Sequence, residues 1–268
     1  MKKVALVTGA SSGIGEQVAL QLADQGYQVV GGARHIAESK AFTARGITTH
    51  QLDVTAHESV VAFVADTVKQ YGRVDVVVNS AGYGSFGALE EVPLAEARRQ
   101  LDVNVLGAMD LVQQVTPYMR QQHSGKVINI SSMAGQTYGV LGGWYFVSKH
   151  ALETMSDVLR LELAPAGIDV VIVEPGVTAT NWASVTNQKM AAATPDDSPY
   201  QALAAKQAAM ITHASQTAAQ VAQVVCKAIA ARKPKTRYAV RWQEGVMMTL
   251  WRLASYKRQD KLALRLAK

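Results

Sequence analysis

Hydrophobic and polar residues follow two alternating rhythms along the chain. Short runs rich in β-branched residues, such as residues 74–79 and 168–173, are apolar at nearly every position. Runs of this kind are typical of strands that helices cover on both faces of a sheet. Between them, longer segments place apolar side chains at helical spacing, as with Ile14, Val18 and Leu22. Because the two patterns alternate, they predict parallel βα units.

The pattern predicts seven strands, which cover residues 3–8, 27–32, 47–52, 74–79, 126–131, 168–173 and 236–240. Helical periodicity is clearest over residues 13–25, 56–70, 100–122 and 146–164. Glycine precedes five of the strands, where a helix ends and only glycine adopts the left-handed conformation without strain. These glycines are Gly26, Gly46, Gly72, Gly125 and Gly167. We therefore expect an α/β fold, a Rossmann-like doubly wound sheet of seven parallel strands, in a single domain over residues 1–240.

Two segments depart from this rhythm. Residues 177–216 are rich in Ala, Thr, Gln and Asn and form a long insertion after the sixth strand. Since sites in open α/β sheets form at the carboxyl ends of strands, we expect this insertion to be a substrate lid. The alternative is a surface excursion without a role in the site. Residues 241–268 are expected to form a basic C-terminal helical extension.

The net charge of +6 is unevenly distributed. Residues 1–226 carry 15 Lys and Arg against 19 Asp and Glu, whereas residues 227–268 carry 12 against 2. Any electrostatic partner would therefore meet the extension. No nucleic-acid motif accompanies the charge, so nucleic acid is not an expected partner. A peripheral membrane helix is one interpretation of the extension, and a packed helix or an oligomer contact is the commoner alternative.

Composition narrows the class of protein further. With 49% hydrophobic and 18% charged residues, the chain is not expected to be disordered. The single cysteine, Cys226, excludes an intramolecular disulfide and a Cys-rich zinc site, and the six histidines show no metal-binding pattern. No apolar run is long enough for a transmembrane helix. The apolar run at the start of the chain is too short for the hydrophobic region of a signal peptide. The expectation is a cytoplasmic protein without a metal.

A glycine-rich loop follows the first strand and opens the first helix. It reads TGASSGIG over residues 8–15. Glycines permit a tight turn and close backbone approach, while the start of a helix offers free N–H groups and a positive dipole to a pyrophosphate. The spacing differs from the common G-x-G-x-x-G fingerprint. In this context the loop predicts a dinucleotide site, a bare turn between strand and helix being the alternative.

The residues after the second strand bear on the choice of dinucleotide. Sites for NAD(H) often place an acidic residue here, where it bonds the adenosine ribose. This chain has Arg34 instead, which suits a charge-assisted bond to a 2′-phosphate. NADP(H) is therefore favoured over NAD(H), a solvated loop arginine being the alternative.

Three residues suggest proton-transfer chemistry. Tyr145 and Lys149 are four residues apart at the start of a predicted helix and so project from one face. A nearby ammonium stabilises phenolate and would lower the pKa of Tyr145. Ser132 ends the fifth strand, at the same edge of the sheet as the glycine loop, where it could donate a hydrogen bond to a substrate oxygen.

A series of short motifs runs in order over roughly residues 3–180: TGASSGIG, Asp53-Val54, Asn79-Ser80-Ala81-Gly82, Asn104, Ser132, Tyr145-x-x-x-Lys149 and Pro175-Gly176-Val177-Thr178. In order and spacing these motifs resemble the short-chain dehydrogenase/reductase family. The general pattern is most similar to its hydroxysteroid and retinol dehydrogenase-like branch.

The resemblance implies a catalytic set of four residues. Tyr145 would exchange a proton with the substrate oxygen, Ser132 would orient and polarise that oxygen, and Lys149 would also hold the nicotinamide ribose. Asn104 would support a water near Lys149 from a locally distorted helix. The implied cofactor contacts are Gly9, Ser11, Ser12, Gly13, Ile14, Gly15, Arg34, Asp53, Val54, Asn79, Ala81, Gly82, Tyr145, Lys149, Pro175, Gly176, Val177 and Thr178.

The expected function is NADP(H)-dependent hydride transfer to or from a carbonyl or alcohol. A lipophilic substrate is expected because apolar residues flank the tyrosine and occupy the insertion. They are Tyr138, Val140, Leu141, Trp144, Trp182, Val185 and Met190, and core packing is the alternative for each of them. A non-catalytic NADP(H)-binding sensor or scaffold and an epimerase or dehydratase that keeps its nicotinamide bound are the alternatives. The resemblance also implies a homo-oligomer through the helices near residues 104–122 and 146–164.

Overall fold

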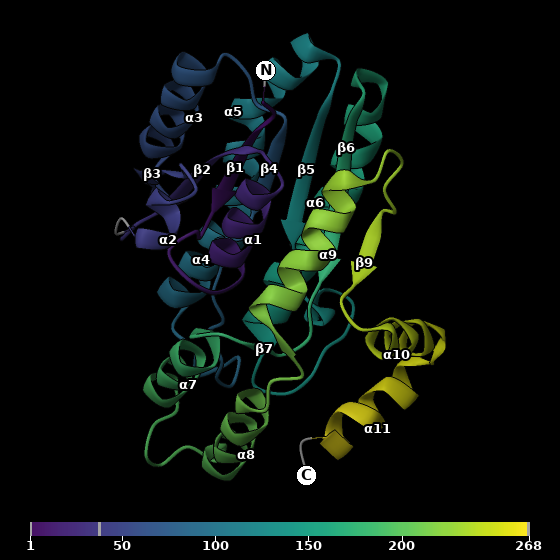
Figure 1. Ribbon diagram of the computed structural model, residues 1–268. Helices are drawn as coiled ribbons and strands as arrows, with labels where there is room; N and C mark the ends of the chain where they lie inside the picture. Colours follow the sequence, from purple (N-terminus) through teal and green to yellow (C-terminus); the bar gives the residue numbers. More distant parts are fainter. Residues whose placement is uncertain (1, 37–38, 267–268) are drawn as a thin grey trace.

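The computed structural model of the protein describes residues 2–36 and 39–266. Seven parallel strands form one sheet in the order β3-β2-β1-β4-β5-β6-β9 (Figure 1). They are β1 (Val4–Thr8), β2 (Gln28–Ala33), β3 (Thr48–Gln51), β4 (Val76–Asn79), β5 (Gly125–Ile130), β6 (Ile168–Glu174) and β9 (Arg237–Ala239). Each predicted strand is present, so the predicted doubly wound sheet is confirmed.

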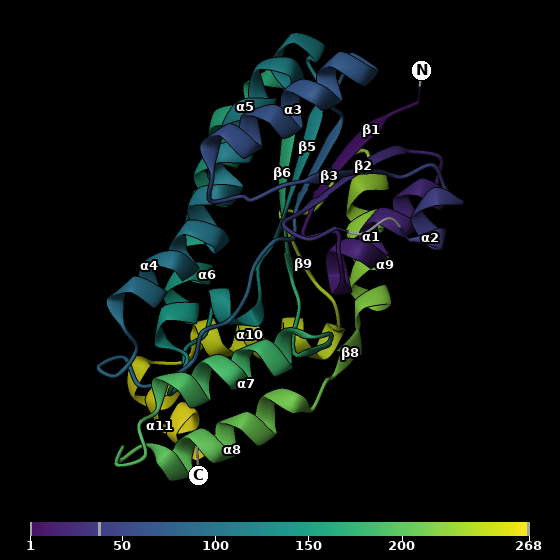
Figure 2. The same cartoon turned by 90° about the vertical axis from the view of Figure 1, so that its left-hand side faces the viewer.

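Helices cover both faces of the sheet (Figure 2). On one face lie α1 (Gly13–Asp24), α2 (Lys40–Thr43) and α9 (Ala218–Ala230). On the other face lie α3 (His57–Tyr71), α4 (Leu94–Leu101), α5 (Gly107–Gln122) and α6 (Gly143–Leu163). Each layer buries an apolar core against the strands, one including Val18 and Val225, the other including Phe63 and Leu111. Burial on both faces explains why the strand sequences are apolar at consecutive positions.

Four of the five predicted helix-ending glycines have the left-handed backbone conformation. They are Gly26, Gly46, Gly72 and Gly167, with φ between 65° and 86°. The prediction was wrong for Gly125, which is the first residue of β5, while His123 takes the left-handed conformation after α5. Glycine at position 125 has a packing role instead, because a Cβ there would lie 2.5 Å from the Met119 Sδ atom.

The helix predicted over residues 100–122 has a break in its hydrogen-bond pattern. The α-helical part α4 ends at Leu101, a π-helical turn covers Asp102–Leu106, and α5 follows directly. Gly107, the first residue of α5, packs so closely that a Cβ would lie 2.5 Å from the Val54 carbonyl oxygen. Local π-helical turns are rare and frequently occur at functional sites.

The insertion and the extension both lie at the carboxyl end of the sheet (Figures 1 and 2). The insertion contains α7 (Trp182–Ala193) and α8 (Gln201–Thr212), bracketed by the paired short strands β7 (Thr178–Ala179) and β8 (Gln216–Thr217). The extension folds into α10 (Trp242–Leu253) and α11 (Tyr256–Leu266). Two 3₁₀ turns, Met133–Gly135 and Ala164–Ala166, complete the described elements. Within the described residues, no helix combines the length and the apolar character needed to cross a bilayer.

Candidate active site

A cavity of about 670 Å³ lies at the carboxyl end of the sheet. Its walls come from the residues that follow β1, β2, β4, β5 and β6, together with the insertion. The order of the strands reverses between β1 and β4, the place where open α/β sheets bind ligands. Of the predicted cofactor contacts all but Asn79 line the cavity, and Ser132 lines it too.

The glycine loop brings the backbone close to the cavity floor. Gly9 and Gly13 have left-handed φ values of 67° and 62°. At Gly15 a Cβ would lie 2.3 Å from the Gly9 carbonyl oxygen, so this position admits no larger residue without a shift of the backbone. The Ser12 side chain does not cap α1, and the first residues of this helix line the cavity. The N–H groups at the start of α1 are therefore available to an anion.

The end of the cavity next to β2 and β3 combines one carboxylate, Asp53, with the guanidinium of Arg34. Asp53 Oδ1 accepts hydrogen bonds from the Thr55 N–H and hydroxyl at 2.9 and 2.7 Å. The backbone hydrogen bond lowers the pKa of Asp53, and the charges of Arg34 and Arg99 act in the same direction against partial burial. Arg34 is exposed after β2 and also lines an adjoining depression with His50. This end can therefore hold both a hydroxyl-bearing ring and a phosphate.

Asn79 is the exception among the predicted contacts. Its side chain is 5% exposed and lies in the core, where Nδ2 donates to Asn129 Oδ1 at 2.8 Å. Asn129 in turn donates to Ser156 Oγ at 2.7 Å. Asn79 thus ties β4 to β5 and is not part of the cavity wall, because its side chain points toward α5, where Nδ2 also donates to the Ala108 carbonyl at 3.4 Å.

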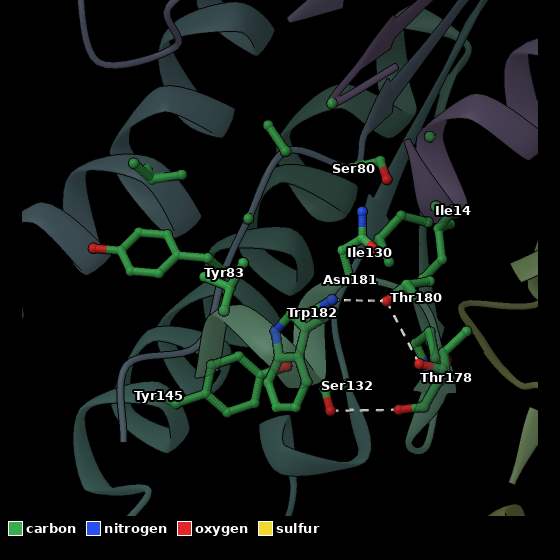
Figure 3. A pocket seen from close by; sticks show the side chains of 18 of the residues that line it. Ile14, Ser80, Tyr83, Ile130, Ser132, Tyr145, Thr178, Thr180, Asn181 and Trp182 are labelled. Atoms are coloured by element: carbon green, nitrogen blue, oxygen red, sulfur yellow. Dashed lines mark hydrogen bonds between the residues drawn. The ribbon is translucent and has the colours of Figure 1, made fainter. Parts of the chain in front are cut away.

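Ser132, Tyr145 and Lys149 line the opposite end of the cavity. Figure 3 shows the side chains of Ser132 and Tyr145 there. Ser132 follows β5, and its Oγ accepts from the Ala134 N–H at 3.2 Å and donates to the Pro175 carbonyl at 3.4 Å. Tyr145 and Lys149 occupy the first turns of α6, where both are buried. The Lys149 ammonium donates to the Ile130 carbonyl at 2.9 Å and lies 5.9 Å from the centre of the Tyr145 ring.

Burial is the main cause of the pKa shifts of Tyr145 and Lys149. It raises the pKa of Tyr145 to about 12, although a hydrogen bond with Ser132 acts in the opposite direction. It lowers the pKa of Lys149 to about 8, opposed by the charge of Glu153. The predicted lowering of the Tyr145 pKa by Lys149 is therefore absent in this structure. At neutral pH, Tyr145 is a neutral hydrogen-bond donor beside a largely charged Lys149.

Asn104 is the remaining member of the predicted catalytic set. It lies in the π-helical turn, buried and outside the cavity wall. Its Oδ1 accepts from the Tyr83 N–H at 3.1 Å, and its Nδ2 donates to the Tyr83 carbonyl and to Ser148 Oγ at 3.0 Å each. Asn104 therefore fastens the loop after β4 to α6, one residue before Lys149.

Aromatic and apolar side chains form the wall above Tyr145. The Trp182 ring lies 5.4 Å from the Tyr145 ring and 5.9 Å from the Phe86 ring, centre to centre (Figure 3). Of the apolar residues expected around the substrate, Trp182 and Val185 line the cavity. The other five do not, and they are Tyr138, Val140, Leu141, Trp144 and Met190. Phe86, Met133, Phe146, Met210 and Ile211 line it in their place.

The loop before α6 explains why two of these five residues, Leu141 and Tyr138, lie elsewhere. Leu141 has a left-handed φ of 60° and is buried, and its carbonyl accepts from the Gly87 N–H at 2.7 Å. Tyr138 packs edge-on against Trp251 of α10, with ring centres 5.2 Å apart. The turn at Leu141 and the C-terminal extension thus direct these side chains away from the cavity.

The sequence matches the family model described as short chain dehydrogenase over residues 3–191. The chain belongs to the short-chain dehydrogenase family. This match confirms the resemblance drawn from the motifs and establishes an oxidoreductase.

Curated relatives support the same family. The "Uncharacterized oxidoreductase YbbO" of Escherichia coli is 33% identical, over 98% of this chain and 94% of that protein. The "Probable short-chain type dehydrogenase/reductase VdlC" of Helicobacter pylori is 37% identical, over 67% of this chain and 66% of that protein. A "3-ketodihydrosphingosine reductase" of Bacteroides thetaiotaomicron is 37% identical, over 69% of this chain and 67% of that protein. The chain thus aligns with just under two thirds of VdlC and with nearly all of YbbO.

Solved structures share the fold. A short-chain dehydrogenase from Streptomyces avermitilis has a TM-score of 0.80 and 32% identity, and the match covers 93% of this chain and 92% of that one. An alcohol dehydrogenase from Thermococcus sibiricus, complexed with 5-hydroxy-NADP, has a TM-score of 0.71 and 26% identity, covering 89% of this chain and 96% of that one.

A partly buried charged cluster lies next to the site of this short-chain dehydrogenase, and the sequence pattern does not predict it. Glu153, one helical turn after Lys149, accepts from Arg237 Nε at 2.9 Å, and Arg237 also donates to Asp157 at 2.6 Å. Glu174 accepts from Gln136 Nε2, and burial together with the charge of Glu153 raises its pKa to about 7. The spacing of Lys149 and Glu153 on one helix face was the available signal.

The C-terminal extension also reaches the site. Glu244 at the start of α10 is 8% exposed and lies so close to Gly176 that a Cβ on this glycine would be 2.3 Å from Oε1. Ser215 Oγ donates to Glu244 Oε1 at 3.2 Å. Gly176 lines the cavity, so α10 supports the wall from behind. Among the residues that the structure describes, no three His, Cys, Asp or Glu side chains are grouped to hold a metal ion.

Proposed function

We propose that this short-chain dehydrogenase transfers a hydride between NADP(H) and the carbonyl or alcohol group of a lipophilic substrate. The observation that carries the proposal is the joint placement of Ser132, Tyr145 and Lys149 beneath an apolar wall, at one end of a cavity whose other end holds Arg34. Hydride transfer needs a nicotinamide, a proton donor and a polarised oxygen within one cleft, and the cleft offers a place for each.

The residues at the reaction end divide the work. Tyr145 is protonated at neutral pH and gives its proton to the substrate oxygen during reduction, while Ser132 orients and polarises that oxygen. The Lys149 charge favours the phenolate that Tyr145 leaves behind. Asn104 holds the loop after β4 against the first turns of α6 through its hydrogen bonds to Tyr83 and Ser148. When bound, the nicotinamide supplies or accepts the hydride.

The residues of the cleft fit a dinucleotide. The glycine loop admits close approach of a pyrophosphate to the start of α1, and Pro175, Gly176, Val177 and Thr178 form the wall at the nicotinamide end. Arg34 favours NADP(H), because a guanidinium binds a 2′-phosphate with charge-assisted hydrogen bonds. The complex of the Thermococcus sibiricus alcohol dehydrogenase with 5-hydroxy-NADP supports the same choice.

A lipophilic substrate follows from the wall above Tyr145. Phe86, Trp182, Met210 and Ile211 offer apolar surface to a hydrocarbon or ring next to the reacting oxygen. The reductase of a long-chain ketone, 3-ketodihydrosphingosine, is among the relatives. Because α7 and α8 supply part of this wall, the insertion acts as the substrate lid in this proposal.

A homo-oligomer through α5 and α6 completes the proposal. The outer face of α6 and the π-helical turn directly before α5 carry large apolar side chains that are well exposed. They include Leu106, Val147, Val158 and Leu161, the last at 70% exposure. Burial of these side chains against a second copy would remove that apolar surface from water.

The test is the oxidation of NADPH, with NADH in parallel, against long-chain, cyclic and short ketones and aldehydes, including 3-ketodihydrosphingosine. We expect turnover with NADPH, faster with the long-chain and cyclic compounds than with the short ones. Turnover that prefers NADH, or that prefers short polar carbonyls, would contradict the cofactor or the substrate assignment respectively.

A further inference from the structure

The outer face of α10 carries a row of exposed apolar side chains, here called the apolar stripe. It consists of Trp242, Val246, Leu250 and Leu253, which are 76%, 49%, 63% and 80% exposed. Their spacing of three or four residues places them on one side of the helix. The opposite side, with Met248 and Trp251, is buried against the rest of the protein. The stripe is therefore a second apolar face, beyond the one that the fold requires.

The neighbouring helix α11 adds a row of cations, here called the basic face. It consists of Lys257, Arg258, Lys261 and Arg265, all exposed and on one side of the helix. Within residues 2–36 and 39–266, none of the four forms an ion pair. The basic face is thus free to meet an anionic partner.

The two acidic residues of the C-terminal part of the chain are engaged by the fold. Residues 227–268 contain only Glu244 and Asp260 against 12 Lys and Arg. Glu244 accepts from Ser215 and from the Arg241 N–H, and Asp260 accepts from the Tyr138 hydroxyl at 2.8 Å. The acidic residues of the extension therefore neutralise only a small part of its positive charge.

The helices α10 and α11 are held in place by packing and by hydrogen bonds. Gln259 of α11 is buried, and its Nε2 donates to the Trp251 and Ala254 carbonyls at 2.7 and 3.2 Å. Trp251 in turn packs against Tyr138. The helices α10 and α11 lie at the same end of the molecule as α7 and α8 (Figures 1 and 2).

We propose that α10 and α11 dock the protein on the surface of a bilayer that contains anionic lipids. The apolar stripe would enter the boundary between headgroups and acyl chains, and the basic face would meet the headgroup charges. A second copy is a poorer occupant, because a symmetric contact through this face would bring two strongly basic segments together. The proposal is independent of the proposed activity, since neither helix supplies a group to the chemistry.

Vesicle co-sedimentation of the full-length protein tests this directly. The protein should pellet with vesicles of equal parts phosphatidylglycerol and phosphatidylcholine, but not with phosphatidylcholine alone, and added salt should weaken the binding. The variant Leu250→Asp/Leu253→Asp should bind at least tenfold more weakly. Substitution of Lys257→Gln and Lys261→Gln should weaken binding about fivefold for each lysine removed.

The matched control is Val61→Asp/Ala62→Asp, which adds the same charge at exposed positions on α3. It should bind within twofold of the wild type, and circular dichroism should show that both double variants are folded. Three results would overturn the proposal: no pelleting of the wild type with anionic vesicles, equal loss in the two double variants, or dissociation of an oligomer by Leu250→Asp/Leu253→Asp without vesicle binding by the wild type.

Discussion

The two ends of the cavity are built from different parts of the chain. At the proposed cofactor end the wall is largely backbone, because the glycine loop folds so tightly on itself that a Cβ at Gly15 would lie 2.3 Å from the Gly9 carbonyl oxygen. At the proposed substrate end the wall is made of large side chains that come from a loop, from the helix α6 and from the insertion, such as Phe86, Tyr145 and Trp182.

This difference determines at which positions of the cavity wall the residue type is fixed and at which it can vary. A wall of backbone requires particular residues at particular spacing, since only glycine fits a left-handed or crowded position. A wall of side chains requires only that apolar groups of suitable volume meet, and many sequences achieve this. Substitutions at the cofactor end should therefore act on cofactor binding, and substitutions at the substrate end on substrate choice.

The largest effect is expected from Tyr145→Phe, which removes the proposed proton donor and keeps the ring. The kcat of carbonyl reduction should fall by about 1,000-fold, while the Kd for NADPH changes less than twofold. Steady-state kinetics and fluorescence titration measure the two quantities. The control Tyr138→Phe, whose hydroxyl bonds Asp260 outside the cavity, should keep full activity. A similar loss of kcat in both variants would show that the substitutions act by disturbing the fold and not by removing a proton donor.

Gly15→Ala should damage the cofactor end selectively. The added Cβ would meet the Gly9 carbonyl oxygen at 2.3 Å, and accommodating it should cost about 1–3 kcal/mol of NADPH-binding free energy, or roughly five- to 150-fold in Kd. Gly26→Ala is the matched control, because Gly26 has a φ of 86° but no atom within 4 Å of its Cβ position. It should lower the Tm without altering NADPH affinity. Unchanged affinity in Gly15→Ala would refute the tight packing of the loop.

Arg34→Ala separates the two dinucleotides. Loss of a charge-assisted hydrogen bond to the 2′-phosphate should weaken NADPH binding by about 1.5–3 kcal/mol, or roughly 10- to 150-fold. NADH binding should change less than twofold, because NADH has no phosphate at that position. Titration of the variant with both cofactors decides the matter, and equal weakening of both would contradict the assignment.

The pH profile tests the charge of Lys149. With a pKa of about 8, this ammonium is charged below that value and loses its charge as the pH rises, whereas Tyr145 stays protonated to about 12. The kcat/KM for reduction should therefore fall about tenfold between pH 7 and pH 9. Lys149→Arg should flatten this decline, since arginine keeps its charge. A constant kcat/KM over this range in the wild type would contradict the role of Lys149.

The smallest effect is expected from Trp182→Ala at the substrate end. Loss of this apolar surface should raise the KM for long-chain ketones about fivefold and leave the Kd for NADPH unchanged. Short ketones should respond less, because they reach less of the wall. A larger change in NADPH affinity than in KM would show that Trp182 belongs to the cofactor end.

The contrast between a wall of backbone and a wall of side chains also explains how much of the fold and of the site the sequence predicts. The seven strands and the glycine loop follow from local rules, because consecutive apolar positions and crowded glycines are visible in the chain itself. Leu141 is expected at the substrate wall but packs in the core, since the left-handed turn at this residue has no glycine to mark it. Met190 of α7 packs in the same core cluster. The contact of Glu153 with Arg237 joins residues 84 positions apart and depends on the fold.

One measurement tests the central claim most directly. A single turnover with a long-chain ketone and NADPH deuterated at the transferable position of the nicotinamide would be followed by mass spectrometry of the product. We predict one deuterium on the alcohol carbon with the wild-type protein and no labelled product within the same time with Tyr145→Phe. NADPH that stays bound and unoxidised, or product formed without the label, would contradict the account.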